Sequence, residues 1–172
     1  IALYRLILAL LLLLPLAANA DDASDFAVAN NSQQAQLLES WSAQPAPARV
    51  ELINSLQQGQ ISVDGQTKPL RLNNRLRGLI DTALASHQLL AADPKLRLSA
   101  AQQLQKSAKP AQLKFLDQQL ASETDSDVHA ALSLALANLQ LVDPDPAVRL
   151  AAVRLLGETG EPLARTRLEA LL

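Results

Sequence analysis

Residues 93–104 read Asp-Pro-Lys-Leu-Arg-Leu-Ser-Ala-Ala-Gln-Gln-Leu, and residues 145–156 read Asp-Pro-Ala-Val-Arg-Leu-Ala-Ala-Val-Arg-Leu-Leu. The two segments share an Asp-Pro start, an arginine at the fifth position, small residues at the seventh and eighth, and a closing leucine. A weaker copy occupies residues 125–136. Self-similarity at helical length is typical of repeat proteins, in which one unit cannot bury its apolar face alone. The copies therefore predict an all-α fold, an α-solenoid of stacked antiparallel helices.

Each copy carries residues suited to the start of a helix. Aspartate is a favoured N-cap, and proline is tolerated as the first helical residue because its missing N–H has no partner there. Histidine takes the arginine position in the middle copy, and Gly157 and Gly160 are predicted to form the turn that ends the last copy. The repeat positions are Asp93, Pro94, Arg97, Asp125, His129, Asp145, Pro146, Arg149 and Gly157.

Apolar residues at helical spacing predict the buried faces of the repeat helices. Those starting at Pro94 and Pro110 would bury Leu96, Ala100, Leu104, Leu113, Leu116 and Leu120. The middle helix, with an unusually wide apolar face that suggests packing on two sides, would bury Val128, Ala131, Leu132, Ala135, Leu136 and Leu139. The last two would bury Val148, Ala151, Ala152, Leu155, Leu156 and, after Pro162, Ala164, Leu168, Leu171 and Leu172.

The spacing of the copies is unequal. Asp125 follows Asp93 by 32 residues, and Asp145 follows Asp125 by 20. A helical hairpin needs about 30 residues or more. The middle unit therefore either lacks its second helix or uses the first helix of the next unit as that partner.

The first twenty residues have the layout of a secretory signal peptide. Tyr4-Arg5 gives a short positive start, residues 6–16 form a leucine-rich run broken only by Pro15, and Ala18-Asn19-Ala20 is a small-x-small cleavage pattern. The alternative is a membrane anchor, but a span takes about 20 apolar residues and this run is shorter. We therefore expect a signal peptide over 1–20 and an extracytoplasmic remainder.

Residues 21–92 predict an N-terminal helical segment interrupted near 60–72. Phe26 and Trp41 are expected in its core. Ile61 and Val63 alternate with polar residues before Asp64-Gly65, a strong turn pair, so a small β-hairpin or an extended excursion is expected. A capped helix should follow, from Arg75 to about Leu90. HEAT-like repeats are expected over 93–172.

The amino-acid composition of the chain argues against several classes of function. The formal charge is −2, and removal of residues 1–20 with their single Arg makes it −3, which argues against binding of nucleic acid or of an anionic membrane surface. The chain has no Cys, so disulfides and thiolate metal sites are excluded. Ala and Leu provide most of the apolar residues, as closely packed helices require.

No residue pattern predicts catalysis, a cofactor or a metal ion. His87 is expected on a helix surface. The acidic residues Glu123, Asp125 and Asp127 lack the Gly and distal Glu of a calcium loop, so we interpret them as a solvated turn between helices. A bilin-lyase type of enzyme shares such repeats, but aromatics make up only 2% of the chain, too few to hold a large chromophore. We expect no enzyme.

His129 allows two interpretations. In stacked repeats, Arg97 and Arg149 could bridge to a turn aspartate of a neighbouring repeat and form a ladder of ion pairs. His129 would then be a weak rung, because histidine is charged only in mild acid. The other interpretation is a neutral surface histidine with no special role.

Several segments, in order, resemble a known family. The pattern at 145–157 resembles a short HEAT-type repeat. Leu-Gln-Gln-Gly at 56–59, Leu-Asn-Asn-Arg-Leu-Arg at 72–77, Leu-Leu at 89–90 and Asp-Pro-x-x-Arg at 93–97 resemble the extracytoplasmic N-terminal region of urea ABC transporter permease subunits, within the branched-chain amino acid permease family.

The resemblance implies an accessory or interaction domain of an inner-membrane permease. Its partners would be the other transporter subunits, a second permease and a periplasmic urea-binding protein among them. The transmembrane domain would follow Leu172, so the chain would meet the membrane only through that downstream part, and no transport residue is carried over. The alternative is a free secreted HEAT-repeat scaffold with an unrelated protein partner.

Overall fold

The computed structural model describes residues 22–160, 165–166 and 169. These residues are mostly helical, with one small two-stranded antiparallel sheet among them. The chain divides into two compact units between His87 and Gln88. The predicted signal peptide lies outside the described residues.

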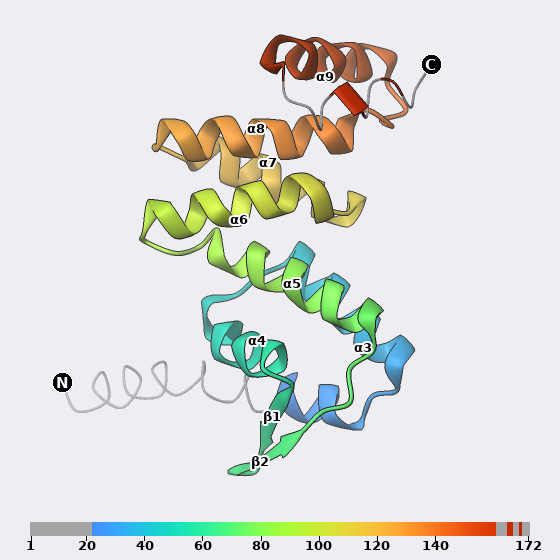
Figure 1. Cartoon of the computed structure of the whole chain (residues 1–172), viewed down its shortest axis with the longest axis vertical. Coiled ribbons are helices and arrows are strands. Elements are labelled where there is room, and N and C mark those ends of the chain that lie inside the picture. The colour runs from blue at the N-terminus through green and yellow to red at the C-terminus, as the bar shows by residue number, and fades with distance from the viewer. Residues whose placement is uncertain (1–21, 161–164, 167–168, 170–172) are drawn as a thin grey trace, which may run out of the picture. The chain divides into compact units, whose positions relative to one another are not determined.

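The first unit begins with helical residues 22–28 and α3 (Asn31–Ala43) (Figure 1). Asn30 starts α3 through a capping box: its side chain accepts from Gln33 N at 3.0 Å, and Gln33 Oε1 accepts from Asn30 N at 2.9 Å. A 3₁₀ turn (Pro47–Arg49) then leads into α4 (Val50–Gln57).

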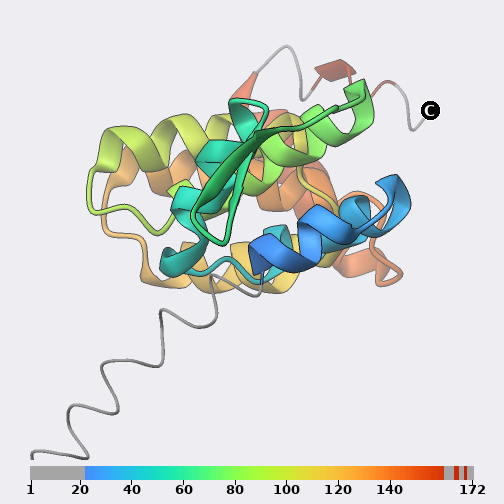
Figure 2. The same cartoon turned by 90° about the horizontal axis from the view of Figure 1, so that it is seen from below.

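The segment near 60–72, for which the sequence allowed either a hairpin or an extended excursion, forms a β-hairpin. It pairs β1 (Gln60–Val63) with β2 (Gln66–Pro69). Asp64 and Gly65 join the strands with φ angles of 52° and 74°, the positive values that a two-residue hairpin turn of type I′ requires. An isolated hairpin is marginal in water. This one buries Ile61 and packs through β1 against α4 (Figures 1 and 2).

The helix α5 (Asn74–Gln88) completes the first unit, and Asn73 caps it by accepting from Leu76 N at 2.8 Å. The expected core positions of Phe26 and Trp41 are confirmed. Both are buried, and their rings stack with centroids 5.8 Å apart. The other buried apolar residues of this core are Ala23, Ala35, Leu38, Ile53, Leu56, Ile61, Leu76, Leu79, Ile80, Ala83 and Leu84.

The second unit contains α6 (Pro94–Ser107), α7 (Leu113–Ser122), α8 (Ser126–Gln140) and α9 (Pro146–Thr159), with a 3₁₀ turn (Pro110–Gln112) before α7. As its wide apolar face predicts, α8 packs on more than one side, against α6, α7 and α9 (Figure 1). Residues 141–145 form only a turn, so α9 follows α8 directly and is its neighbour. The middle copy therefore has no second helix of its own.

Some predicted core positions are wrong. Leu96 is 46% exposed, Leu155 is 38% exposed, and Ala151 is exposed. In α6 the buried residues are Ala100, Ala101 and Leu104, and in α9 they are Ala152 and Leu156. Each buried stripe is narrower than the apolar pattern, because small alanines mark the line of contact and the outer leucines fall beyond it.

The turn predicted at Gly157 and Gly160 is confirmed for Gly160 and wrong for Gly157. Gly157 is an exposed residue inside α9, and the helix continues to Thr159. Gly160 ends it with φ of 61°, the left-handed conformation that glycine adopts without a steric penalty. The partner helix expected after Pro162, with Ala164, Leu168, Leu171 and Leu172, lies outside the described residues.

Candidate functional site

The three repeat aspartates each cap a helix, as predicted for Asp93 and Asp145; Asp125, which the sequence places only in a solvated turn, also does so. Asp93 accepts from Lys95 N at 2.9 Å, and Asp145 accepts from Ala147 N at 2.8 Å. Asp125 accepts from the N–H groups of residues 127 and 128 at 3.0 and 3.1 Å. Pro94 and Pro146 occupy the first helical positions of α6 and α9. These five repeat positions thus define where α6, α8 and α9 begin.

Arg97 joins two turns of the second unit. Its Nη1 donates to the carbonyl oxygens of Ala91 and Ala92, at 3.0 and 2.8 Å. Its Nε and Nη2 donate to the two carboxylate oxygens of Glu123, at 2.8 and 2.9 Å. The acid of this bidentate pair is therefore Glu123, in the turn before α8, whereas the ladder hypothesis placed an aspartate there. The Glu123 side chain is only 6% exposed, so water screens the pair weakly.

Arg149 repeats one half of this arrangement. Its Nη1 donates to the carbonyl oxygens of Asp143 and Pro144, at 2.6 and 3.0 Å. In both arginines the acceptors are the carbonyls six and five residues earlier in the chain. We call this arrangement the arginine clamp.

His129 occupies the equivalent position on α8, four residues after the cap Asp125, and is exposed. The carbonyls six and five residues before it belong to Glu123 and Thr124. Replacement by arginine would supply the clamp that the flanking copies have. We expect His129→Arg to raise the melting temperature near pH 7.5 by a few degrees, since each added hydrogen bond contributes about 1 kcal/mol.

Circular dichroism during heating would measure this shift. His129→Lys is the matched control, because it adds the charge without the planar donor geometry. An equal or lower melting temperature for the arginine variant would show that the position is an ordinary surface site.

The carboxylate of Glu123 is strongly held in its charged form. The hydrogen bonds from Arg97 lower its pKa to about 2, burial opposes this, and the backbone N–H groups of Asp125 and Thr124 lower it further. The pKa of Arg97 is raised, mainly by the same pair. The acidic residues 123, 125 and 127 are therefore not simply a solvated turn. Glu123 pairs with Arg97, and Asp125 caps α8.

A second polar centre lies in the first unit. Arg49 Nε donates to Asp22 Oδ2 at 2.8 Å, Arg49 Nη1 donates to Gln44 O at 3.1 Å, and the guanidinium lies 5.1 Å from the centre of the Trp41 ring. This cation–π contact and ion pair tie the start of the unit to the turn before α4. They help to fix the 3₁₀ turn that directs the chain into α4.

His87 is buried, and its expected surface position is wrong. It is 1% exposed, because α5 buries residues around most of its circumference near its C-terminal end. Nδ1 lies 2.7 Å from Ala83 O, and Nε2 has no hydrogen-bond partner. Burial lowers the pKa of His87 and nearby Arg49 adds to this, while the Ala83 carbonyl and Asp22 oppose it. The ring is therefore neutral at pH 7.

Acid should destabilise the first unit through His87. The unfolded chain takes up a proton near the ordinary pKa of 6.5, while the folded ring resists it. The stability that depends on the neutral ring should therefore be fully present above pH 7. Below pH 6.5 the free energy of unfolding should decrease, by up to about 1.4 kcal/mol per pH unit. Trp41 is the only tryptophan, and its fluorescence during urea unfolding would report this unit. His87→Leu should reduce the fall, whereas His129→Leu should retain it.

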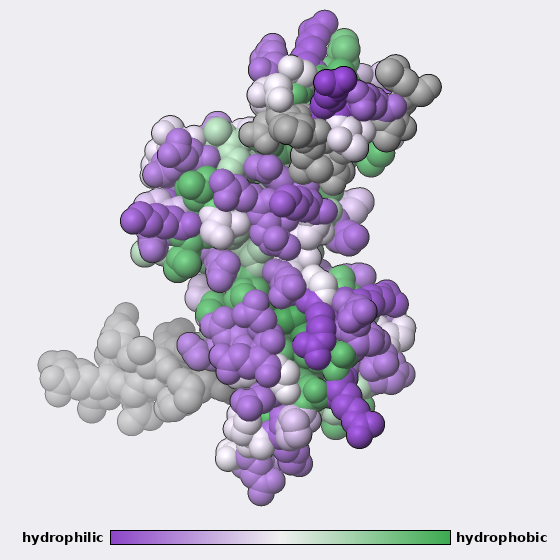
Figure 3. All heavy atoms as spheres, in the orientation of Figure 1, coloured by the Kyte–Doolittle hydropathy of each residue, from purple (hydrophilic) through white to green (hydrophobic). Residues whose placement is uncertain are grey.

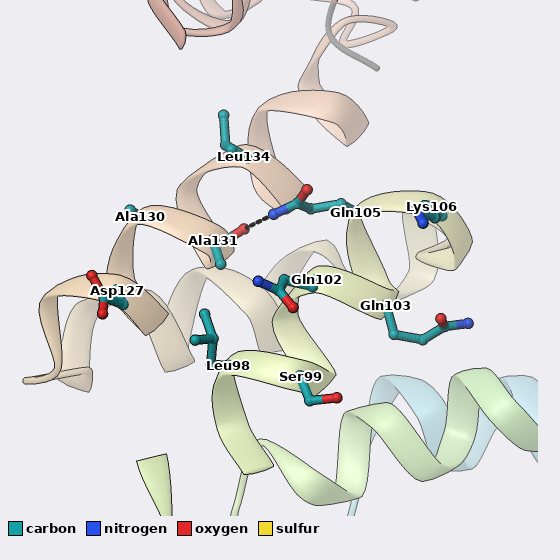
Figure 4. Close-up of a pocket in the computed structure, with 10 residues that line it drawn as sticks. All are labelled: Leu98, Ser99, Gln102, Gln103, Gln105, Lys106, Asp127, Ala130, Ala131 and Leu134. Atoms are coloured by element: carbon teal, nitrogen blue, oxygen red, sulfur yellow. Dashed lines mark hydrogen bonds between the residues drawn. The ribbon is translucent and has the colours of Figure 1, made fainter. Parts of the chain in front are cut away.

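A groove of about 710 Å³ runs between α6 and α8, and Figure 4 shows its lining. Gln105 Nε2 crosses it to Ala131 O at 3.2 Å, and Asn138 Nδ2 donates to Gln105 O at 3.3 Å, so hydrogen bonds join the two helices here. The lining consists of Leu98, Ser99, Gln102, Gln103, Gln105, Lys106, Asp127, Ala130, Ala131 and Leu134. On the face seen in Figure 3, hydrophilic side chains alternate with small apolar areas over this unit. We refer to this feature as the α6–α8 groove.

Sequence reasoning missed this groove, although a signal was present. Ser99, Gln102, Gln103 and Lys106 follow the i, i+3, i+4, i+7 spacing of one helix face, and residues 127, 130, 131 and 134 follow the same spacing. A search for buried apolar positions does not identify such polar helix faces.

Within the described residues, no group of three or more His, Cys, Asp or Glu side chains could hold a metal ion. None of the described helices is long and apolar enough to cross a bilayer. No protein-family model, curated protein or solved structure matches the chain.

Proposed function

We propose that this chain is a protein-interaction domain built of HEAT-like repeats. The observation that carries the proposal is the arginine clamp with its capping aspartate, which recurs on α6 and α9 and is matched in all but the arginine on α8. Recurrent local geometry supports a stack of related units, and such stacks mostly present surfaces to partners. The open groove on this unit is a surface of that kind.

We further propose that the domain is the extracytoplasmic part of a urea ABC transporter permease subunit. The leucine-rich first twenty residues and the order of segments between residues 56 and 157 support this assignment. The full-length protein would lie in the bacterial inner membrane, with the domain in the periplasm. Its partners would be the second permease and the periplasmic urea-binding protein.

Purification from the native membrane tests both proposals. The gene product would be tagged at its chromosomal locus, extracted with detergent and examined for copurified proteins. Recovery with the permease, ATPase and urea-binding subunits, together with loss of urea uptake when the gene is deleted, is the expected result. Recovery from the soluble periplasm without those subunits would instead support the free secreted scaffold. Recovery from the cytoplasm would refute export and the family assignment together.

A further inference from the structure

The α6–α8 groove has two walls of different character. Apart from Leu98, the α6 wall is polar, with Ser99, Gln102, Gln103 and Lys106 along it, and these four residues are exposed. The α8 wall is formed by Ala130, Ala131 and Leu134 after Asp127. The two alanines of this wall leave room for an extended chain to approach the helix between Asp127 and Leu134.

The amides of the α6 wall suit a peptide backbone. Each glutamine offers one carbonyl acceptor and one NH₂ donor, the same pair of functions that a peptide unit needs. Gln105 is already engaged with Ala131 O, whereas Gln102 and Gln103 are exposed (Figure 4). In Figure 4 the Gln102 side chain points towards Ala131, whereas Gln103 points away from α8. The Gln102 amide can therefore bond to a peptide group of a chain that lies in the groove.

The charges of the groove lie at its two ends. Asp127 is in the first turn of α8 and Lys106 is in the last turn of α6. Because the two helices run side by side in the same direction, these residues mark opposite ends of the groove, as Figure 4 shows. A ligand that lies along the groove would meet an anion at one end and a cation at the other.

We propose that the α6–α8 groove binds an extended peptide segment of about four residues with a cationic side chain at one end, over Asp127, and an anionic one at the other, over Lys106. The helical rise from Leu98 to Lys106 is about 12 Å, at roughly 1.5 Å per residue. An extended chain advances about 3.3 Å per residue, so about four residues fill that length. The inference rests on the proposed interaction role and specifies the chemistry of the partner segment.

Side-chain amide signals of Gln102 and Gln103 in nitrogen-15 NMR spectra of the full chain would measure binding. The probe is acetyl-Lys-Ala-Ala-Glu-amide, compared with the Lys/Lys and Glu/Glu peptides of the same length. We expect a dissociation constant in the millimolar range. The few contacts of a short peptide in an open groove only slightly exceed the translational, rotational and conformational entropy that it loses on binding. The Lys/Glu peptide should bind about two- to fivefold more tightly than either like-charged peptide, as exposed ion pairs allow.

Charge reversal should switch the preference. Lys106→Glu makes both ends anionic and should favour the Lys/Lys peptide, and Asp127→Lys makes both ends cationic and should favour the Glu/Glu peptide. The double variant should again favour the Lys/Glu peptide. Lys114→Glu and Asp117→Lys are the matched controls, because both residues are exposed on α7 and neither lines the groove.

Absence of glutamine signal changes at several millimolar peptide would overturn the inference, as would a peptide preference that the groove variants leave unchanged. Either result can coexist with copurification of the transporter subunits, which would show that the domain binds its partner through another surface. Peptide binding without copurification would refute the transporter assignment and leave the groove inference standing.

Discussion

Replacing Leu132 with alanine is expected to lower the free energy of unfolding of the second unit by about 2–5 kcal/mol. Leu132 is 1% exposed and lies on α8, the helix that packs against α6, α7 and α9. Truncation removes three buried carbons and leaves a cavity that neighbours on several sides cannot all close. The measurement is urea unfolding followed by far-UV circular dichroism, with the slope compared between variants.

Leu150→Ala is the matched control for this prediction. Leu150 lies on α9 and is 50% exposed, so the same truncation there should cost well under 1 kcal/mol. Similar losses for the two variants would mean that α8 is not the central helix of this unit.

Glu123→Gln is expected to lower the melting temperature at pH 7 by about 5 °C or more. The substitution keeps the shape of the side chain but removes the charge that accepts two hydrogen bonds from Arg97. The guanidinium would then retain the two carbonyls of the arginine clamp and, in the glutamine Oε1, a single neutral acceptor in place of the bidentate carboxylate. The turn between α7 and α8 should loosen, because Glu123 also accepts from the N–H groups of Thr124 and Asp125.

The same pair predicts a distinct acid response. The folded pKa of Glu123, about 2, lies below its ordinary value of 4.5, so the stability from this carboxylate is complete above about pH 5. It should be lost as the pH falls from 5 towards 2, because protonation removes the charged acceptor. The difference in melting temperature between the native chain and Glu123→Gln should therefore shrink across that range. Glu158→Gln, at an exposed position of α9, is the control and should show no such convergence. A difference that stays constant with pH would contradict the role of the charge.

Local signals account for the parts of the fold that the sequence predicted. The caps at Asp93 and Asp145, the turn at Asp64-Gly65 and the capped start of α5 each depend on a few neighbouring residues. Interactions of this range are encoded in short stretches of chain, so pattern alone identifies them. The wide apolar face of α8 belongs to the same class, because it is a property of one helix.

Long-range contacts account for what the sequence left open or predicted wrongly. His87 reads as a polar helix residue, and only the packing around the end of α5 makes it buried and lowers its pKa. Leu96 and Leu155 read as core residues, yet the line of contact on their helices passes through the alanines. A sequence pattern gives the period of a helix face, but the neighbouring helix decides which part of that face is covered.

The sequence by itself determined that helices begin after Asp93 and Asp145, and that a tight turn at Asp64-Gly65 interrupts the segment before them. Only the tertiary structure decided that Arg97 reaches Glu123, 26 residues along the chain, and that Lys106 and Asp127 stand at the two ends of one groove. The physical reason is the range of the interactions. Caps and turns are closed by bonds within a few residues, whereas a bidentate ion pair and a groove exist only after separate helices have packed side by side.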